Sequence, residues 1–407
     1  MEECGYERSK KYLLLAIMLI ILILFGIQRN ISKQQYKINS YSLAIFVDGE
    51  KKDTYPERGN YNVSVDCRGK ANGSWDYNNW GLIIKNFNDG AACNIIFTTG
   101  KKFNEYIIDA SRTDSNIIYM EQPDTVQTGS NAKEEYRYTG ANPNNYVYFG
   151  CDSNCTEDNL YRIIGVLPTQ KEENGYYENR VKLIKATEYQ ENESGYLKEG
   201  YGYDWNTDGT NNWEYSKVQI NVLNGVYWKS LSKYQEYIEP TVWYLGAIGN
   251  GAEDYLYKSL SAKQVYQYER GNIKAGSGGS LQYTDYIGLM YPSDYGFSIS
   301  TEYCDLAIDS NYSAYLSNNA WLYQSYLSTR TEWLITPDGG AMDSTYNSTL
   351  AYRLHTVSND FYGMPLYRHW VNVYSTGYIR PTFNLKANVM YKSGDGTSSN
   401  PYRIEIN

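Results

Sequence analysis

Short runs of alternating apolar and polar residues, broken by Gly, Asn and Asp turns, follow one another from about residue 40 onward. Alternation with a period of two is typical of β-strands with one buried face. In the segment 38–110 the pattern predicts four strands, at Ser42–Val47, Asn60–Val65, Gly81–Ile84 and Asn94–Thr98. We therefore expect a small β-sandwich-like module over 38–110.

The next residues, 111–134, are polar and rich in turn-forming steps, which predicts a linker. A second domain is expected over 135–407, with strands at Tyr146–Phe149, Tyr161–Val166, Val181–Ala186, Tyr378–Leu385 and Tyr402–Ile406. Two helices, Lys217–Leu223 and Val226–Tyr237, are expected on either side of Asn224-Gly225, and each has a Ser-x-x-Gln capping spacing. The pattern predicts a mixed α+β fold class.

One apolar run precedes these domains, at 12–27, and it contains no charged residue. At about 1.5 Å per residue it covers roughly 24 Å, which spans a hydrocarbon core if flanking Lys and Arg side chains extend to the lipid headgroups. We expect a transmembrane anchor after a cytoplasmic tail, 1–11. A cleaved signal peptide is the first alternative, but no small-residue cleavage site ends the run. A buried core helix is the second.

The basic residues do not orient this anchor, because Arg8, Lys10 and Lys11 before it are matched by basic residues soon after it. A first hydrophobic segment after a short tail normally acts as a signal anchor. The expected localisation is therefore the cell membrane, with a single pass and the bulk of the chain extracellular. The lipid bilayer would be the partner of segment 12–27.

The cysteines fit an oxidising exterior. Cys67 ends one predicted strand and Cys93 opens another, the placement expected of a disulfide that staples a small β-domain. Cys151 and Cys155 lie in one turn-rich loop and are spaced for a small disulfide loop, whereas a zinc site would need two further ligands. Cys304 has no expected disulfide partner in the chain. Three roles are open to it: a buried thiol, an intermolecular disulfide or a nucleophile.

The composition limits the classes of partner that the chain is expected to bind. The formal net charge is -9 and no Lys/Arg run forms a basic patch, so nucleic acid is not expected to bind. The chain has 46 Tyr and 2 His. Tyrosine suits half-buried strands and recognition surfaces, although an AT-rich genome would also enrich it.

Several phrases of the second domain resemble a large uncharacterised family of surface proteins from low-GC Gram-positive gut bacteria. They are RYTGANPNNYVYFG (137–150), YRIIGV (161–166), YIGLMYPSDYGF (286–297), EWLITPD (332–338) and IRPTFNLKANVMYKSGDGTSSNPYRI (379–404). The resemblance implies a C-type-lectin-like domain over 135–407, similar to formylglycine-generating enzymes and phage receptor-binding proteins. It implies scaffold roles for Trp333 and Arg380. Formylglycine-generating enzymes use a late cysteine pair, and no cysteine follows Cys304, which argues against oxidase chemistry.

The first half of a calcium-binding loop motif is present at Asp204, Asn206 and Asp208. It has oxygen-bearing side chains at alternate positions before a glycine. Tyr215 occupies the place of the bidentate glutamate, so a complete EF-hand is excluded. Calcium is the cofactor that this loop would take, and a solvated turn is the alternative.

Trp205 and Trp213 flank the same loop, with Asn212 beside them. Open indole rings next to amides are suited to sugar recognition, because rings stack on sugar C–H faces while amides bond hydroxyls. The alternative is that both rings pack beneath the predicted helices.

These features favour a membrane-anchored extracellular binding or adhesion protein that recognises a glycan or another surface ligand without catalysis. A cell-wall or glycan hydrolase, using an unidentified carboxylate pair, is one alternative. A purely structural envelope protein is the other.

Overall fold

The computed structural model describes residues 17–21, 42–59, 61–68, 71–85, 91–121, 134–172, 176–191, 195–207, 210–245, 261–270, 282–299, 320–324, 327, 330–337, 350–354, 366–370 and 376–406. They form two compact units, which divide between Gly100 and Lys101. This boundary precedes the predicted one at 110, because α2 (Phe103–Ala110) packs within the larger unit, where Tyr106 stacks on Tyr391 at a centroid distance of 3.8 Å.

Unit 1 is built from a four-stranded sheet in the order β2-β1-β6-β3 and the hairpin β4-β5. The strands are β1 (Ser42–Val47), β2 (Glu50–Lys52), β3 (Tyr61–Arg68), β4 (Asn72–Asp76), β5 (Gly81–Lys85) and β6 (Ala92–Thr99). β1 runs parallel to β6, whereas the other pairs of this unit are antiparallel. All four predicted strands are present, and β2 and β4 were not predicted.

The hairpin packs on the sheet through aromatic rings. Trp75 of β4 meets the fully buried Phe97 of β6 edge to face, with ring centroids 4.9 Å apart. The hairpin approaches β3 closely at Gly73, where an added Cβ would lie 2.3 Å from Cγ1 of Val65. Cys67 lies opposite Cys93 in the β3–β6 register, and the predicted disulfide joins them.

Unit 2 is centred on an eight-stranded sheet, with the path β14-β22-β11-β10-β8-β7 and with β17 and β9 pairing off it. These strands are β7 (Ile117–Glu121), β8 (Glu134–Tyr138), β9 (Tyr146–Tyr148), β10 (Leu160–Gln170), β11 (Tyr177–Lys185), β14 (Ile238–Glu239), β17 (Ile287–Gly288) and β22 (Thr382–Leu385). Residues 111–134 were predicted to be a linker, but part of this segment forms β7, which pairs with β8 in the central sheet.

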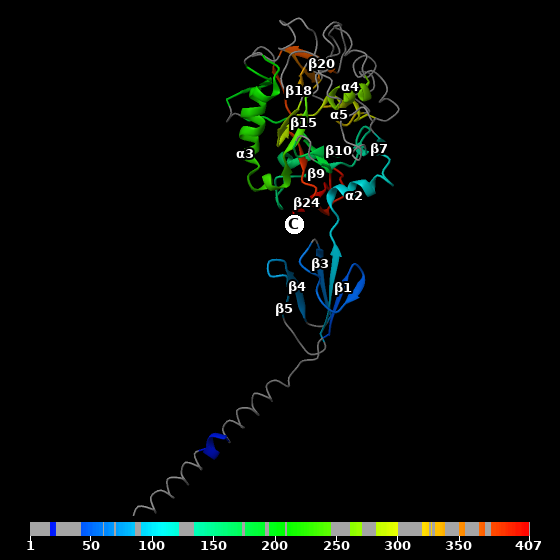
Figure 1. The fold of residues 1–407 in the computed structure, drawn as a ribbon, viewed down its shortest axis with the longest axis vertical. Helices are drawn as coiled ribbons and strands as arrows, with labels where there is room; N and C mark the ends of the chain where they lie inside the picture. Colours follow the sequence, from blue (N-terminus) through cyan, green and yellow to red (C-terminus); the bar gives the residue numbers. More distant parts are fainter. Residues whose placement is uncertain are drawn as a thin grey trace, which may run out of the picture. The chain divides into compact units, whose positions relative to one another are not determined.

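Smaller sheets surround the central one. Their strands are β12 (Leu197–Lys198), β13 (Gly202–Asp204) and β21 (Thr376–Gly377); β15 (Thr241–Tyr244) and β16 (Gln282–Asp285); β18 (Glu332–Pro337), β19 (Leu350–Leu354) and β20 (Leu366–Trp370); and β23 (Val389–Ser393) and β24 (Arg403–Ile406). The helices are η1 (Glu157–Asn159), η2 (Trp213–Tyr215), η3 (Val218–Tyr227), α3 (Trp228–Ser230), η4 (Ser232–Tyr237), α4 (Ala262–Arg270) and α5 (Pro292–Gly296). Within unit 2, the segment around α3 and the α4–α5 pair lie on opposite sides of the central strands (Figure 1).

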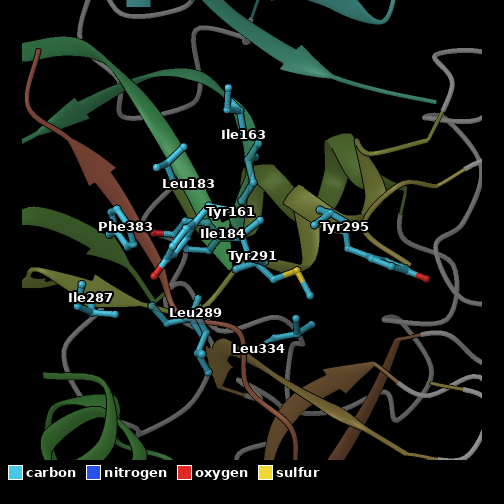
Figure 2. Packing of buried hydrophobic residues seen from close by; sticks show 14 of the residues in the cluster. Tyr161, Ile163, Leu183, Ile184, Ile287, Leu289, Tyr291, Tyr295, Leu334 and Phe383 are labelled. Carbon is cyan, nitrogen blue, oxygen red and sulfur yellow. The ribbon is translucent and has the colours of Figure 1, made fainter. Parts of the chain in front are cut away.

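The predicted α+β fold class is wrong, because the part of the chain that the structure describes is mostly β, with 43% strand and 21% helix. The error has a physical cause in β10, which is buried at nearly every position and so shows no polar alternation to mark its full length. Figure 2 shows buried side chains of the central strands, among them Ile163, Leu183 and Phe383, which belong to the same hydrophobic core as Leu334 of β18.

The two predicted helices form one helical segment instead of two. η3, α3 and η4 follow one another from Val218 to Tyr237, and Asn224-Gly225 lies inside the segment rather than between two helices. The reason is that η3 is a π-helix, whose wider turn includes the glycine.

Among the described residues, no helix has both the length and the hydrophobicity to cross a membrane. Only residues 17–21 of the predicted anchor 12–27 are described, and they are helical. The rest of the anchor and the tail 1–11 lie outside the described residues.

A buried network of charges ties α5 to the central sheet. Asp294 of α5 accepts hydrogen bonds from Arg137 of β8 at 2.9 Å and from Lys182 of β11 at 2.5 Å. Nε of Arg137 also pairs with Glu135, at 2.6 Å, and Tyr266 of α4 donates its hydroxyl to the same carboxylate. Each of these side chains is almost completely buried.

Burial and mutual attraction set the protonation of this network. Burial alone would raise the pKa of Asp294, but the cations of Lys182 and Arg137 lower it to about 2. Burial lowers the pKa of Lys182 to about 8, against the attraction of Asp294. Burial raises the pKa of Glu269, at the end of α4, to about 7, although Arg270 and Ser293 oppose the rise. The Asp294 carboxylate therefore stays charged at neutral pH and holds the two cations against α5.

We predict that Asp294→Ala lowers the free energy of unfolding by about 3–5 kcal/mol, because it leaves buried cations without their carboxylate. Urea denaturation followed by circular dichroism measures the loss. Asp109→Asn is the control, because Asp109 also pairs with a lysine but its side chain is 41% exposed. The control should unfold at the urea concentration of the wild type, and an equally stable Asp294→Ala variant would contradict the role of the network.

Candidate functional site

A hollow of about 430 Å³ opens in unit 2 beside the helical segment 218–237. We call it the tyrosine pocket, and its defining side chains are those of Asp158, Tyr161, Lys185, Glu188, Tyr189 and Tyr227. They come from both the sheet and the helical segment, so the pocket depends on the tertiary fold rather than on one local motif.

Two neighbouring strands bring Tyr161 and Lys185 together. The β10–β11 register pairs these two residues directly, and Nζ of Lys185 lies 5.6 Å from the centroid of the Tyr161 ring. Nζ donates to the carbonyl oxygen of Asp158 at 2.8 Å. Burial lowers the pKa of Lys185, while the carboxylates of Asp158 and Glu188 raise it. The amine is thus held in place at the base of the pocket by the backbone and by two nearby anions.

The helical segment contributes Tyr227 to the lining of the pocket. Its hydroxyl lies 2.6 Å from that of Tyr161, and both rings are almost completely buried. Burial raises the pKa of both phenols, so they remain protonated and share a hydrogen bond at neutral pH. Tyr189 meets the Tyr227 ring edge to face, with centroids 5.0 Å apart, and is only half-buried. Tyr189 is therefore the ring best placed to meet a ligand.

The ten-residue π-helix η3 positions Tyr227, which is its last residue. π-Helices are rare and occur often at functional sites. Gly225 fits this geometry, because a Cβ there would lie 2.9 Å from the carbonyl oxygen of Ile220, five residues earlier. Asn224 fastens η3 to β17, since its amide donates to the Ile287 carbonyl at 2.9 Å and accepts from the Ile287 amide at 3.0 Å. The helix is held rigidly behind the pocket.

Polar groups form the rim. Gln190 donates from its amide to Glu188 at 3.2 Å, and Asn159 donates to the carbonyl of Gly150 at 3.2 Å. Gln190 is exposed, as is Asp158. Ring faces surrounded by amides and carboxylates suit a ligand that has apolar faces and many hydroxyl groups.

Trp205 and Trp213, the candidate sugar-binding rings, are buried, at 0% and 1% exposure, as the alternative of packed rings expects. Nε1 of Trp205 donates to the carbonyl of Leu334 in β18 at 3.1 Å, and the two rings pack together. Asn212 caps η2, where its side chain accepts a hydrogen bond from the backbone of Glu214. These residues support the fold beside the loop and present no ring face to a ligand.

The candidate calcium residues are engaged with protein groups. Asp204 is buried and pairs with Lys198 at 2.9 Å. Burial raises its pKa, against the lowering effect of Lys198. The side-chain amide of Asn206 donates a hydrogen bond to the carbonyl oxygen of Thr210 at 2.9 Å. Asp208 lies outside the described residues, and among the residues that are described no cluster of metal-ligating side chains is present.

Cys151 and Cys155 form the predicted disulfide, in the loop that precedes η1. Cys304 and His355 lie outside the part of the chain that the structure describes. Trp333 and Arg380 are buried, and Arg380 pairs with Glu332 at 2.7 Å, as expected of scaffold residues.

Sequence reasoning missed the tyrosine pocket. One signal was available, because Lys185, Glu188 and Tyr189 end a predicted strand and enter the turn after it, where polar groups gather at a sheet edge. Nothing in the sequence linked that turn to Tyr227.

Comparison of the chain with protein-family models, with curated proteins and with solved structures gives no match. The resemblance to bacterial surface proteins stays a prediction.

We predict that Gly225→Ala distorts η3, because its methyl group would press on the Ile220 carbonyl, and that it moves Tyr227 out of hydrogen-bond distance from Tyr161. The free energy of unfolding should fall by more than about 1 kcal/mol, and backbone amides of 218–230 should exchange faster in hydrogen-exchange mass spectrometry. Gly81→Ala is the matched control, since its Cβ would meet nothing closer than 3.9 Å. Unchanged exchange in the Gly225 variant would show that the glycine does not shape η3.

Proposed function

We propose that this protein is a non-catalytic binding protein of the cell exterior, attached to the membrane through segment 12–27, which recognises glycans in the tyrosine pocket. The observation that carries the proposal is the composition of this pocket, in which the half-buried ring of Tyr189, packed against the buried Tyr227, stands beside amides and carboxylates.

Pocket shape and chemistry both support a sugar-like ligand. A cavity of about 430 Å³ has the size of a small-molecule site. The half-buried ring of Tyr189 offers a face to the C–H groups of a sugar, while Gln190, Glu188 and Asn159 offer donors and acceptors to its hydroxyls. The concave aromatic surface favours binding over a purely structural envelope role.

The exterior location is supported by cysteine chemistry. Disulfides persist mainly in oxidising compartments, and each unit contains one, Cys67–Cys93 and Cys151–Cys155. The uncharged run 12–27, with basic residues on both sides, is the segment suited to hold such a protein at the bilayer.

Glycan hydrolysis is the second candidate, because Asp158 and Glu188 place two carboxylates in the same pocket. Paired carboxylates are the groups that most glycosidases use as acid and as base or nucleophile.

Tyr189→Ala should weaken glycan binding about tenfold, or about 1.4 kcal/mol, because it removes the most accessible ring of the pocket. A glycan array identifies a ligand for the full chain, and titration calorimetry then measures its affinity. Tyr189→Phe keeps the ring and should bind as the wild type does.

Tyr176→Ala is the control for tyrosine loss as such, since Tyr176 is 96% exposed and does not line the pocket. Equal affinities of Tyr189→Ala and wild type would refute the site. Release of shorter sugars from the bound glycan, abolished by Asp158→Asn or Glu188→Gln, would establish hydrolysis instead.

Protease added to intact cells should degrade both units if they face the exterior. Full protection of the chain, with a known surface protein digested in the same sample, would contradict the proposed location.

A further inference from the structure

A second hollow, of about 140 Å³, adjoins the tyrosine pocket, and the backbone at Phe149 and Gly150 borders both. We call it the staple pocket, after the disulfide beside it, and its defining residues are Tyr148, Cys151, Tyr234, Tyr237, Lys392 and Arg403. Like the tyrosine pocket, it is lined by several tyrosines and by charged side chains.

The same two parts of the chain line both hollows. The helical segment gives Tyr227 to the tyrosine pocket and Tyr234 and Tyr237 to the staple pocket, while 148–161 contributes to each. The two hollows therefore follow one seam between the helical segment and residues 148–161.

A continuous row of aromatic rings runs beneath this seam. The Phe149 ring lies 5.6 Å from the ring of Tyr161 on one side, and 6.0 Å and 6.2 Å from those of Tyr237 and Tyr234 on the other. Phe149 itself is 2% exposed. The tyrosines of the two pockets are thus parts of one packed aromatic surface and not separate patches.

One side of the staple pocket is fixed by the disulfide loop. Nη1 of Arg403 donates to the carbonyl of Asp152 at 3.1 Å and lies 3.4 Å from Sγ of Cys155. Its guanidinium stacks over Tyr148 at 5.0 Å from the ring centroid. The loop and the strand β24 are therefore bound to each other at the staple pocket.

Charge in the two hollows is nearly balanced. Lys392 pairs with Glu405 at 2.9 Å, Lys233 pairs with Asp152 at 2.6 Å, and Lys185 donates to the Asp158 carbonyl. An anionic polymer such as polyphosphate would have to displace these contacts, and a chain of net charge -9 would repel it. A neutral, hydroxyl-rich ligand meets no such cost.

We propose that the two hollows are subsites of one groove, which takes a chain of several neutral sugar units across Phe149 and Gly150. The inference rests on the proposed glycan function and specifies its ligand as an oligosaccharide rather than a single sugar. The tyrosine pocket holds one unit of the chain and the staple pocket another.

The test is titration calorimetry of the full chain, in a detergent without sugar groups, against N-acetylglucosamine and glucose oligomers of one to six units. Affinity for the recognised series should rise at least tenfold as the chain lengthens and then level off once both subsites are filled. Tyr234→Ala should remove most of this gain and leave the affinity for the shortest ligand unchanged, whereas Tyr189→Ala should weaken both. Tyr176→Ala should change neither.

Binding that is independent of chain length, or a Tyr234→Ala variant that keeps the full gain, would overturn the groove and leave the glycan function standing. Tighter binding of a polyphosphate chain than of any sugar oligomer would overturn the choice of a neutral ligand. Failure of every oligomer, together with a glycan array that gives no ligand for the folded chain, would refute both the groove and the function on which it rests. Circular dichroism of each variant confirms that lost binding does not reflect lost folding.

Discussion

Burying a tyrosine ring removes its hydroxyl from water, so the hydroxyl must find a partner inside the protein. In a chain with 46 tyrosines this requirement decides which elements can pack together. Tyr161 shares a hydrogen bond with Tyr227, and Tyr244 donates to Gln170 at 2.8 Å. The partners lie 66 and 74 residues apart in sequence. Each such bond therefore fixes the position of one distant segment against another, and the first of them also shapes the pocket.

The charges in the core obey the same rule at a higher energetic cost. The free-energy cost of desolvating a carboxylate is offset only where cations and hydrogen-bond donors surround it. Asp294 has Arg137, Lys182 and the backbone of Tyr291 within hydrogen-bond distance. Aromatic rings complete the enclosure, since Arg270 stacks over Tyr291 at 4.1 Å from the ring centroid. Phenols and ion pairs together thus make a core in which polar groups specify the packing of α4 and α5 on the sheet.

Local features of the fold could be predicted from the sequence, and features that depend on distant partners could not. Cys67 and Cys93 stand in strands that the alternation marks clearly, so their disulfide followed from local pattern. The burial of Trp205 did not follow from local pattern, because the hydrogen-bond partner of its indole is the carbonyl of Leu334, 129 residues away. The same limit applies to the candidate site. Tyr161 and Lys185 lie in predicted strands, but their pairing depends on the β10–β11 register, and Tyr227 reaches them only through a π-helix that sequence propensities do not reveal.

The parallel pairing of β1 with β6 sets an order of events during synthesis of unit 1. β1 is the first described strand of this unit and β6 is the last. A ribosome releases β1 long before β6 exists, so in the interval β1 can pair only with β2, its hairpin neighbour. The native disulfide of Cys67 likewise cannot form until β6 delivers Cys93. The sheet and its cross-link are therefore completed together, in a late step that begins when the last strand of the unit emerges.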